Sequence, residues 1–244
     1  MKDKVILITG GASGLGNTIA HHLFTENATI IVFDVNSDKL SETCRDFDTY
    51  IVDVTDYDAV QQSVDAIIET YGKIDVLINN AGVIHSELLV NITKQDGMKH
   101  SYDSFKNTLK VDLDSVFIMT SIVAEKMILS RTKGCIINIS SICAQGNAGQ
   151  TAYSAAKGGV ESLTKTWGKE LGVFGIRTNA IAPGFIDTPS TSAALNEETV
   201  KHIIDNTPLR ALGNTGNIAQ AVSYIINNDF VNASVLQIDG GLTL

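Results

Sequence analysis

Seven short aliphatic runs, separated by longer segments, constrain the fold of this 244-residue chain more than any other feature of its sequence. The clearest of these runs, such as 5–8, are continuously apolar rather than alternating, which is typical of a strand buried on both faces of a parallel sheet. A strand that shows one face to water would instead alternate apolar and polar residues. We therefore predict buried strands at residues 5–8, 29–33, 50–52, 75–78, 135–139, 176–181 and 235–238.

The longer segments between these runs carry apolar residues at helical spacing. Thr55 or Asp56 can cap the start of one such segment, and Gly72 can end it. No Gly/Ser/Pro-rich linker divides the chain. We predict a single-domain α/β Rossmann fold over residues 1–244, with a doubly wound seven-stranded parallel sheet and helices on both faces. The predicted helices cover residues 15–26, 56–71, 103–130, 153–173 and 215–228.

Residues 183–214 differ in composition from the rest of the chain. They contain all three prolines and a Thr/Ser-rich tract at 188–192, with little strand pattern. Ligands of a doubly wound sheet bind outside the carboxyl ends of its strands, where the strand order reverses. We expect residues 183–214 to form a mobile substrate flap over that cleft, with a plain surface connection as the alternative.

Composition excludes several classes of partner. The 27 acidic and 18 basic side chains give a net charge of −9, so nucleic acid and anionic membranes would be repelled. Cys44, Cys135 and Cys143 form no CxxC pair, and no histidine has a partner at metal spacing, so we expect no disulfide framework and no metal site. The first apolar run is too short for a signal peptide, and no run reaches the roughly 18 apolar residues of a membrane span. We expect a cytoplasmic protein with a small-molecule substrate.

A glycine-rich turn follows the first predicted strand. It reads Thr9-Gly10-Gly11-Ala12-Ser13-Gly14-Leu15-Gly16, directly before an amphipathic segment. Glycine at positions 10, 14 and 16 allows a tight turn, close approach of a pyrophosphate, and close packing of the helix on the strand. The helix N-terminus then offers free N–H groups to the phosphates. This pattern predicts a dinucleotide-binding site.

The end of the second predicted strand indicates which dinucleotide binds. Asp34 can accept both hydrogen bonds from the adenosine ribose diol, and its charge would repel a 2′-phosphate. Ser13 and Val35 supply no cation for such a phosphate. The sequence therefore favours NAD over NADP.

Tyr153 and Lys157 share one face of a predicted helix, because they are four residues apart. The spacing alone proves little, since Tyr102 and Lys106 repeat it. The context of Tyr153 is distinctive, because it follows a strand that ends in Asn138-Ile139-Ser140-Ser141 and opens a helix rich in small residues.

With these motifs in order, the whole chain resembles the classical short-chain dehydrogenase/reductase family. The resemblance rests on the glycine-rich turn at 9–16, Asn79-Asn80-Ala81-Gly82, Ser140-Ser141, Tyr153-Xaa-Xaa-Xaa-Lys157, Pro183-Gly184 and Asp239-Gly240-Gly241. It implies that Tyr153 is the general acid for ketone reduction and the base for alcohol oxidation. It also implies that Lys157 lowers the tyrosine pKa and holds the nicotinamide ribose.

The same resemblance places a serine beside the substrate oxygen. The family commonly has 13 residues from this serine to the tyrosine, whereas Tyr153 follows Ser141 by 12 and Ser140 by 13. The second serine after the strand is the usual one, so we assign the role to Ser141 and infer a one-residue deletion in the loop. Ser141 would stabilise charge that develops on the substrate oxygen.

Position 112 departs from the family pattern. The family usually has asparagine there, and its side-chain amide braces the helix by donating to backbone, whereas an ionised Asp112 cannot donate. Asp112 near Lys157 would keep that lysine charged and partly cancel its effect on Tyr153. We include Asp112 in the candidate catalytic set and expect an altered pH profile, with a substitution of no consequence as the alternative.

Further cofactor contacts follow by position. The resemblance implies Asp53 and Val54 beside the adenine, Asn80 and Gly82 beside a ribose, and Ile186 and Thr188 beside the carboxamide. The candidate cofactor residues are Gly10, Ser13, Gly14, Leu15, Gly16, Asp34, Asp53, Val54, Asn80, Gly82, Tyr153, Lys157, Pro183, Gly184, Ile186 and Thr188.

These residues predict an NAD(H)-dependent oxidoreductase that acts on a secondary alcohol or ketone. Residues 172–185 are similar to β-ketoacyl-acyl-carrier-protein reductases, but those enzymes usually prefer NADPH and need a basic docking surface. We therefore favour a sugar, a polyol or a small hydroxy acid, with the ketoacyl reductase as one alternative and a catalytically impaired NAD-binding regulator as another. The resemblance implies a homotetramer, or a homodimer. The segment 84–112 is longer than the corresponding segment usually is in the family. Its polar part is either a substrate-facing insertion or a solvated loop.

Overall fold

Strands and helices alternate along the chain in the computed structural model, which describes residues 1–94, 97–188, 191 and 196–244. The strands of the main sheet are β1 (Val5–Thr9), β2 (Thr29–Asp34), β3 (Asp48–Ile51), β4 (Val76–Asn79), β5 (Cys135–Ile139), β6 (Arg177–Pro183) and β9 (Val235–Ile238). The helices are α1 (Gly14–Thr25), α2 (Ser37–Thr43), α3 (Tyr57–Tyr71), α4 (Tyr102–Leu109), α5 (Ser115–Leu129), α6 (Thr151–Leu171), α8 (Glu197–Asn206) and α9 (Thr215–Asn227).

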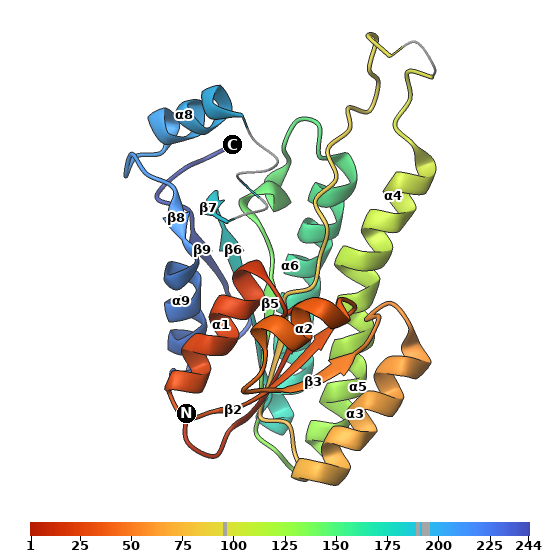
Figure 1. Ribbon diagram of the computed structural model, residues 1–244, viewed down its shortest axis with the longest axis vertical. Coiled ribbons are helices and arrows are strands. Elements are labelled where there is room, and N and C mark those ends of the chain that lie inside the picture. Colours follow the sequence, from red (N-terminus) through yellow and green to blue (C-terminus); the bar gives the residue numbers. More distant parts are fainter. Residues whose placement is uncertain (95–96, 189–190, 192–195) are drawn as a thin grey trace.

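The seven main strands form one parallel sheet in the order β3-β2-β1-β4-β5-β6-β9. The order reverses between β1 and β4, so the sheet is doubly wound, and helices cover both of its faces (Figure 1). The predicted Rossmann fold is confirmed. The loops after β1 and β4 meet at the point of reversal, where such folds bind ligands.

Strands β1, β2, β4 and β5 contribute to both layers of the core, because successive side chains point to opposite faces. From β1, Ile6 and Ile8 pack with residues of α1 and α9, whereas Val5 and Leu7 pack with residues of α3 and α5. This burial on both faces explains why a central strand such as β1 is continuously apolar over residues 5–8.

The limits of α3 follow from its capping residues. The Asp56 side chain accepts a hydrogen bond from the Ala59 N–H, and Gly72 ends the helix in the left-handed region at φ 74°. Of the two candidate caps, the structure uses Asp56, and Gly72 ends the helix as predicted.

The helix expected at 103–130 is present over residues 102–129, but it is not a regular α-helix throughout. A π-helical turn at Lys110–Asp114 separates α4 from α5 and contains Asp112. The wider turn changes which side chains face the sheet, and it could not be read from a pattern of period 3.6. Helix α2 was also not expected, because it buries only Leu40 and so leaves little apolar periodicity.

The segment expected to be a flap has more regular structure than its sequence indicated. It contains α8 and two short parallel strands, β7 (Ile186–Asp187) and β8 (Gly213–Asn214). Only Ile203 is buried in α8, so this helix contributes little to the core. Residues 189, 190 and 192–195 of the Thr/Ser-rich region lie outside the described residues. In the part of the chain that the structure describes, no helix is both long and apolar enough to cross a bilayer.

Candidate active site

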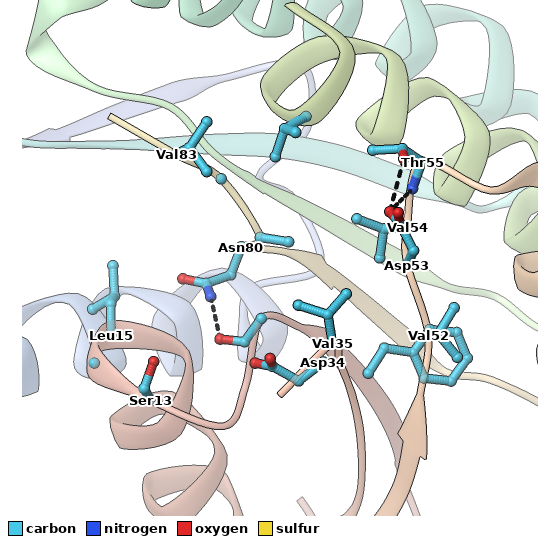
Figure 2. A pocket seen from close by; sticks show the side chains of 16 residues that line it. Ser13, Leu15, Asp34, Val35, Val52, Asp53, Val54, Thr55, Asn80 and Val83 are labelled. Atoms are coloured by element: carbon cyan, nitrogen blue, oxygen red, sulfur yellow. Dashed lines mark hydrogen bonds between the residues drawn. The ribbon is translucent and has the colours of Figure 1, made fainter. Parts of the chain in front are cut away.

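A cavity of about 480 Å³ lies at the reversal of strand order. Its walls come from the loops that follow β1, β2, β3 and β4. Figure 2 shows Ser13 and Leu15 on one side and Val54 and Thr55 on the other, with Asp34 between the two groups. The predicted cofactor residues that line this cavity are Gly10, Ser13, Gly14, Leu15, Asp34, Asp53, Val54, Asn80 and Gly82.

The glycine-rich turn is held by close backbone contacts. Gly10 has φ +63°, and a Cβ atom there would lie 2.9 Å from the Ala81 Cα. The Asn80 side-chain amide donates to the Thr9 carbonyl at 3.0 Å and to the Gly10 carbonyl at 2.9 Å, and Figure 2 shows the second of these bonds. Asn80 thus braces the turn as well as lining the cavity.

Gly16 lies behind this turn rather than in the cavity wall. A Cβ atom on Gly16 would overlap the Asn80 amide and the Gly10 carbonyl, so the position accepts only glycine. Its contribution is the close packing of α1 against the turn. Among the described residues, α1 has no side-chain cap at Ser13, so its first N–H groups are available to a ligand.

The Asp34 carboxylate is oriented by the backbone around it. One oxygen accepts the Ala12 N–H and the other accepts the Asn36 N–H, each at 3.0 Å. These bonds fix the carboxylate at the end of β2, where it lines the cavity. Its neighbour Val35 is exposed and carries no charge.

A second cavity of about 250 Å³ adjoins the first, because Gly14 and Leu15 line both. Its wall includes Ser141 and Tyr153, and Cys143 and Phe185 complete the side expected to border a substrate. The predicted cofactor residues Pro183, Gly184, Ile186 and Thr188 line it as well. His85 instead lines a separate hollow, and Ile84 takes its place here.

The two candidate serines point to different surroundings. Ser140 is buried, and its hydroxyl donates to the Glu161 carboxylate at 3.1 Å. Ser141 begins a 3₁₀ turn, and its oxygen accepts the Cys143 N–H at 3.1 Å. Ser141 lines the second cavity together with Tyr153, so its position suits the role assigned to it, whereas the Ser140 hydroxyl is bound to a carboxylate of α6.

Lys157 and Asp112 form a buried ion pair below Tyr153. The lysine Nζ lies 3.3 Å from the Asp112 Oδ1 and donates to the Ile139 carbonyl at 3.0 Å. The Asp112 carboxylate accepts the Val83 N–H, and burial raises its pKa despite the nearby lysine. Asp112 therefore ties the loop after β4 to α6, a contact in which it accepts rather than donates.

Gly82 explains how the loop approaches this ion pair so closely. A Cβ atom at position 82 would lie 2.5 Å from the Asp112 Oδ1. Sequence reasoning had placed Gly82 beside a ribose and missed the contact between Val83 and Asp112. Only the continuation of the Asn79-Asn80-Ala81-Gly82 motif into Val83 could have indicated it.

Tyr153 lines the second cavity and lies beside the buried ion pair of Lys157 and Asp112. Burial raises the pKa of Tyr153 above its ordinary value, and the negative charge of Asp112 adds to that increase. Lys157 and the hydrogen bond with Ser141 act in the opposite direction and lower the same pKa. The lysine ammonium lies 5.5 Å from the centre of the tyrosine ring.

The first cavity suits a dinucleotide, and the second, which adjoins it, contains Tyr153 with Ser141 and Lys157 nearby. This combination defines the class of protein. Proton transfer at Tyr153 and hydride transfer at the nicotinamide are complementary, so the fold and site define a nicotinamide-dependent oxidoreductase.

Comparison with known sequences gives the family. The sequence model of the short chain dehydrogenase family matches residues 4–199, and the chain belongs to this family. It is 38% identical over 254 residues to the 3-oxoacyl-(acyl-carrier-protein) reductase FabG of Thermotoga maritima, covering 100% of this chain and 99% of that one. It is 32% identical over 260 residues to the sorbitol-6-phosphate 2-dehydrogenase of Klebsiella pneumoniae, covering 100% and 97%.

A solved structure agrees with these relatives. The crystal structure of levodione reductase superposes with a TM-score of 0.89 at 33% sequence identity, covering 99% of this chain and 98% of that one. The family resemblance seen in the sequence is thereby confirmed, and the protein is an oxidoreductase of this family acting on CH–OH or C=O groups.

Proposed function

We propose that this protein is an NAD(H)-dependent oxidoreductase that transfers a hydride between nicotinamide and a secondary alcohol or ketone. The observation that carries the proposal is the continuity of the two cavities through Gly14 and Leu15. One dinucleotide can therefore reach from Asp34 to Tyr153. Asp34 suits an unmodified ribose diol, and its charge disfavours a 2′-phosphate.

NAD, when bound, supplies the hydride chemistry. In ketone reduction, the Tyr153 hydroxyl donates its proton to the substrate oxygen, and in alcohol oxidation the phenolate takes the proton back. The Ser141 oxygen accepts the Cys143 N–H, so its own proton can be donated to the substrate oxygen. Lys157 stabilises the phenolate by its charge, and the loop after β6 closes the other side of the cavity.

Removing the Ser141 hydroxyl by Ser141→Ala is expected to lower kcat by about 10²- to 10³-fold, because one donor to the developing oxyanion is lost. Ser140→Ala is the matched control. It should destabilise the fold by about 1–3 kcal/mol, because Glu161 stays buried with one hydrogen bond fewer, and should leave kcat nearly unchanged. Steady-state kinetics and chemical denaturation measure the two effects, and a larger loss of kcat in Ser140→Ala would reverse the assignment.

Asp112 acts through Lys157 and Tyr153, so we treat it as a positioning residue. Asp112→Asn removes a negative charge that raises the pKa of Tyr153, and an asparagine oxygen can still accept the Val83 N–H. Alcohol oxidation requires the phenolate, so its rate rises with pH through that pKa. We expect the pH at half-maximal kcat/KM for oxidation to move to a lower value in the variant. An unchanged pH profile would show that Asp112 has no electrostatic role.

Two substrate classes remain as proposals. We favour a sugar, a polyol or a small hydroxy acid, because Asp34 disfavours NADPH and a net charge of −9 disfavours an acidic carrier protein. The similarity to the Klebsiella pneumoniae sorbitol-6-phosphate 2-dehydrogenase supports this choice. The greater similarity to the Thermotoga maritima reductase supports the second candidate, a 3-oxoacyl thioester.

The test of this function has two stages. Purified protein is titrated with NADH and with NADPH by fluorescence, and the preferred cofactor is then used with polyols, sugars, hydroxy acids and 3-oxoacyl thioesters. Tighter NADH binding with turnover of a polyol, sugar or hydroxy acid supports the proposal, whereas NADPH preference with thioester turnover supports the second candidate. Cofactor binding without turnover of any compound would favour the impaired regulator.

We further propose a homotetramer, as the family resemblance implies. Exposed Phe117 and Leu129 of α5 line a hollow with Trp167 of α6, and such an apolar surface suits contact with a second copy.

Residues 183–214 are proposed as the substrate flap, since Phe185 and Ile186 line the second cavity. The cysteines are free and buried, which supports the expected reducing cytoplasm.

A further inference from the structure

Residues 83–94 and 97–101, which lie between β4 and α4, are defined here as an arm with an outgoing and a returning part. The Asn91 N–H donates to the Met98 carbonyl, and the His100 N–H donates to the Leu89 carbonyl at 2.9 Å. The arm extends beyond the N-terminal end of α4 (Figure 1). Its outgoing and returning parts are therefore held side by side near its base.

Three side chains meet between these two parts of the arm. The Nε2 atom of His85 lies 3.2 Å from the Glu87 Oε2, and the Nε2 atom of His100 lies 3.8 Å from the same oxygen. One ligand atom from each residue falls within 4.8 Å of the others. The two rings meet edge to face, with their centres 5.8 Å apart.

One ring nitrogen of His100 has no hydrogen-bond partner among the described residues. Its Nδ1 lies 3.1 Å from the Glu87 carbonyl, which can only accept, so Nδ1 carries the proton. In the neutral ring, Nε2 then presents a lone pair toward a carboxylate. That Nε2 is buried, and it is the nitrogen left without a partner among the described residues. A histidine that donates one nitrogen to a backbone carbonyl and offers the other to a cation is the usual arrangement at metal centres.

The Glu87 carboxylate accepts hydrogen bonds that suit its ionised form, so it can act as the anionic ligand among the three side chains. Lys94 hydrogen-bonds to its Oε1, and the Ser101 N–H donates to its Oε2 at 3.1 Å. These contacts, together with His85 at 3.2 Å from the Glu87 Oε2, are those that a carboxylate accepts. Lys94 is also a competing cation, 2.6 Å from the carboxylate oxygen on the far side from the histidines.

We propose that His85, Glu87 and His100 bind a divalent transition-metal ion, with Zn²⁺ as the best match. Two imidazole nitrogens and one carboxylate oxygen suit zinc rather than Mg²⁺ or Ca²⁺, which prefer oxygen ligands. Tetrahedral zinc with bonds of about 2.1 Å places its ligand atoms about 3.4 Å apart. The two separations from the Glu87 oxygen are 3.2 and 3.8 Å, and all three ligand atoms lie within 4.8 Å of one another. Three protein ligands leave the fourth position for water.

A bound ion would fix the base of the arm beside the candidate active site. The Glu87 N–H donates to the Gly149 carbonyl, and the Gln150 side chain donates to the Ser86 hydroxyl. Gln150 directly precedes α6 and lines the same cavity as Tyr153. The metal site thus adjoins the substrate cavity without contacting Tyr153, and its existence does not depend on the proposed reaction.

Isothermal titration of the tag-free, full-length protein with ZnCl₂, after removal of metals by chelation, tests the proposal. We expect one equivalent of Zn²⁺ to bind and MgCl₂ to give no binding. His85→Asn and His100→Gln should each weaken Zn²⁺ binding at least about a hundredfold. His202→Asn is the control, because His202 is exposed on α8, and it should bind as the unmodified protein does.

A second variant keeps the test valid if a histidine variant folds poorly. Lys94→Met removes an exposed competing cation, so Zn²⁺ should bind more tightly, by about tenfold. Co²⁺ in place of Zn²⁺ should give the visible absorption of a four-coordinate ion, and His100→Gln should abolish it. Absence of Zn²⁺ binding, or binding that is equal in all the variants, would overturn the proposal and leave a His100–Glu87 ion pair as the explanation.

Discussion

Tyr153→Phe is expected to lower kcat about 10³-fold while NADH binds within about twofold of its original affinity. The phenol oxygen is the proton donor and acceptor of the proposed reaction, and phenylalanine keeps the ring that packs in the second cavity. The loss should therefore fall on kcat rather than on folding. Single-turnover kinetics and a fluorescence titration with NADH measure the two quantities separately.

The chain supplies a matched control for this experiment. Tyr102 and Lys106 repeat the spacing of Tyr153 and Lys157, but Tyr102 is 71% exposed at the start of α4. Tyr102→Phe should leave kcat unchanged. If Tyr153→Phe kept most of the activity, the proton would have to come from another group, and the proposed mechanism would be wrong.

Asp34→Ala combined with Val35→Arg is expected to shift the ratio of NADH to NADPH affinity by about 10²- to 10³-fold toward NADPH. Loss of the carboxylate removes charge-assisted hydrogen bonds to the ribose diol, worth about 1.5–3 kcal/mol. The introduced arginine can pair with a 2′-phosphate, and Val35 is exposed at the cavity wall, so the longer side chain has room. Titration with both cofactors gives the ratio directly.

Asp38→Ala is the control for general charge effects. Asp38 lies in the first turn of α2, close in sequence to Asp34 but outside the cavity wall, so its removal should leave the ratio nearly unchanged. Equal shifts in both proteins would mean that net charge, rather than the Asp34 contact, selects the cofactor. An unmodified protein that already prefers NADPH would contradict the proposal before any variant is made.

Much of the fold could be predicted from local patterns. Continuous apolar runs such as 5–8 indicated buried parallel strands, because residues on both faces of the sheet must be apolar there. The positions of the glycine turn and of Asp34 after successive strands placed the cofactor cavity, since parallel strands end at one edge. The π-helical turn was missed because it departs from a period of 3.6 residues, and α8 was missed because its residues had been assigned to a flap.

Other properties depend on contacts between residues that are distant in the chain. The sequence alone determined the doubly wound sheet, the family and the Tyr153–Lys157 pair, because these follow from periodicity and short motifs. Both serines line the second cavity, and only the tertiary structure showed that the Ser140 hydroxyl donates to Glu161 whereas the Ser141 oxygen accepts a backbone N–H. Likewise, only the tertiary structure showed that His85 and Glu87 lie close to His100. The direction of a side chain, and the partner that it meets across a loop or helix, are fixed by packing rather than by local sequence.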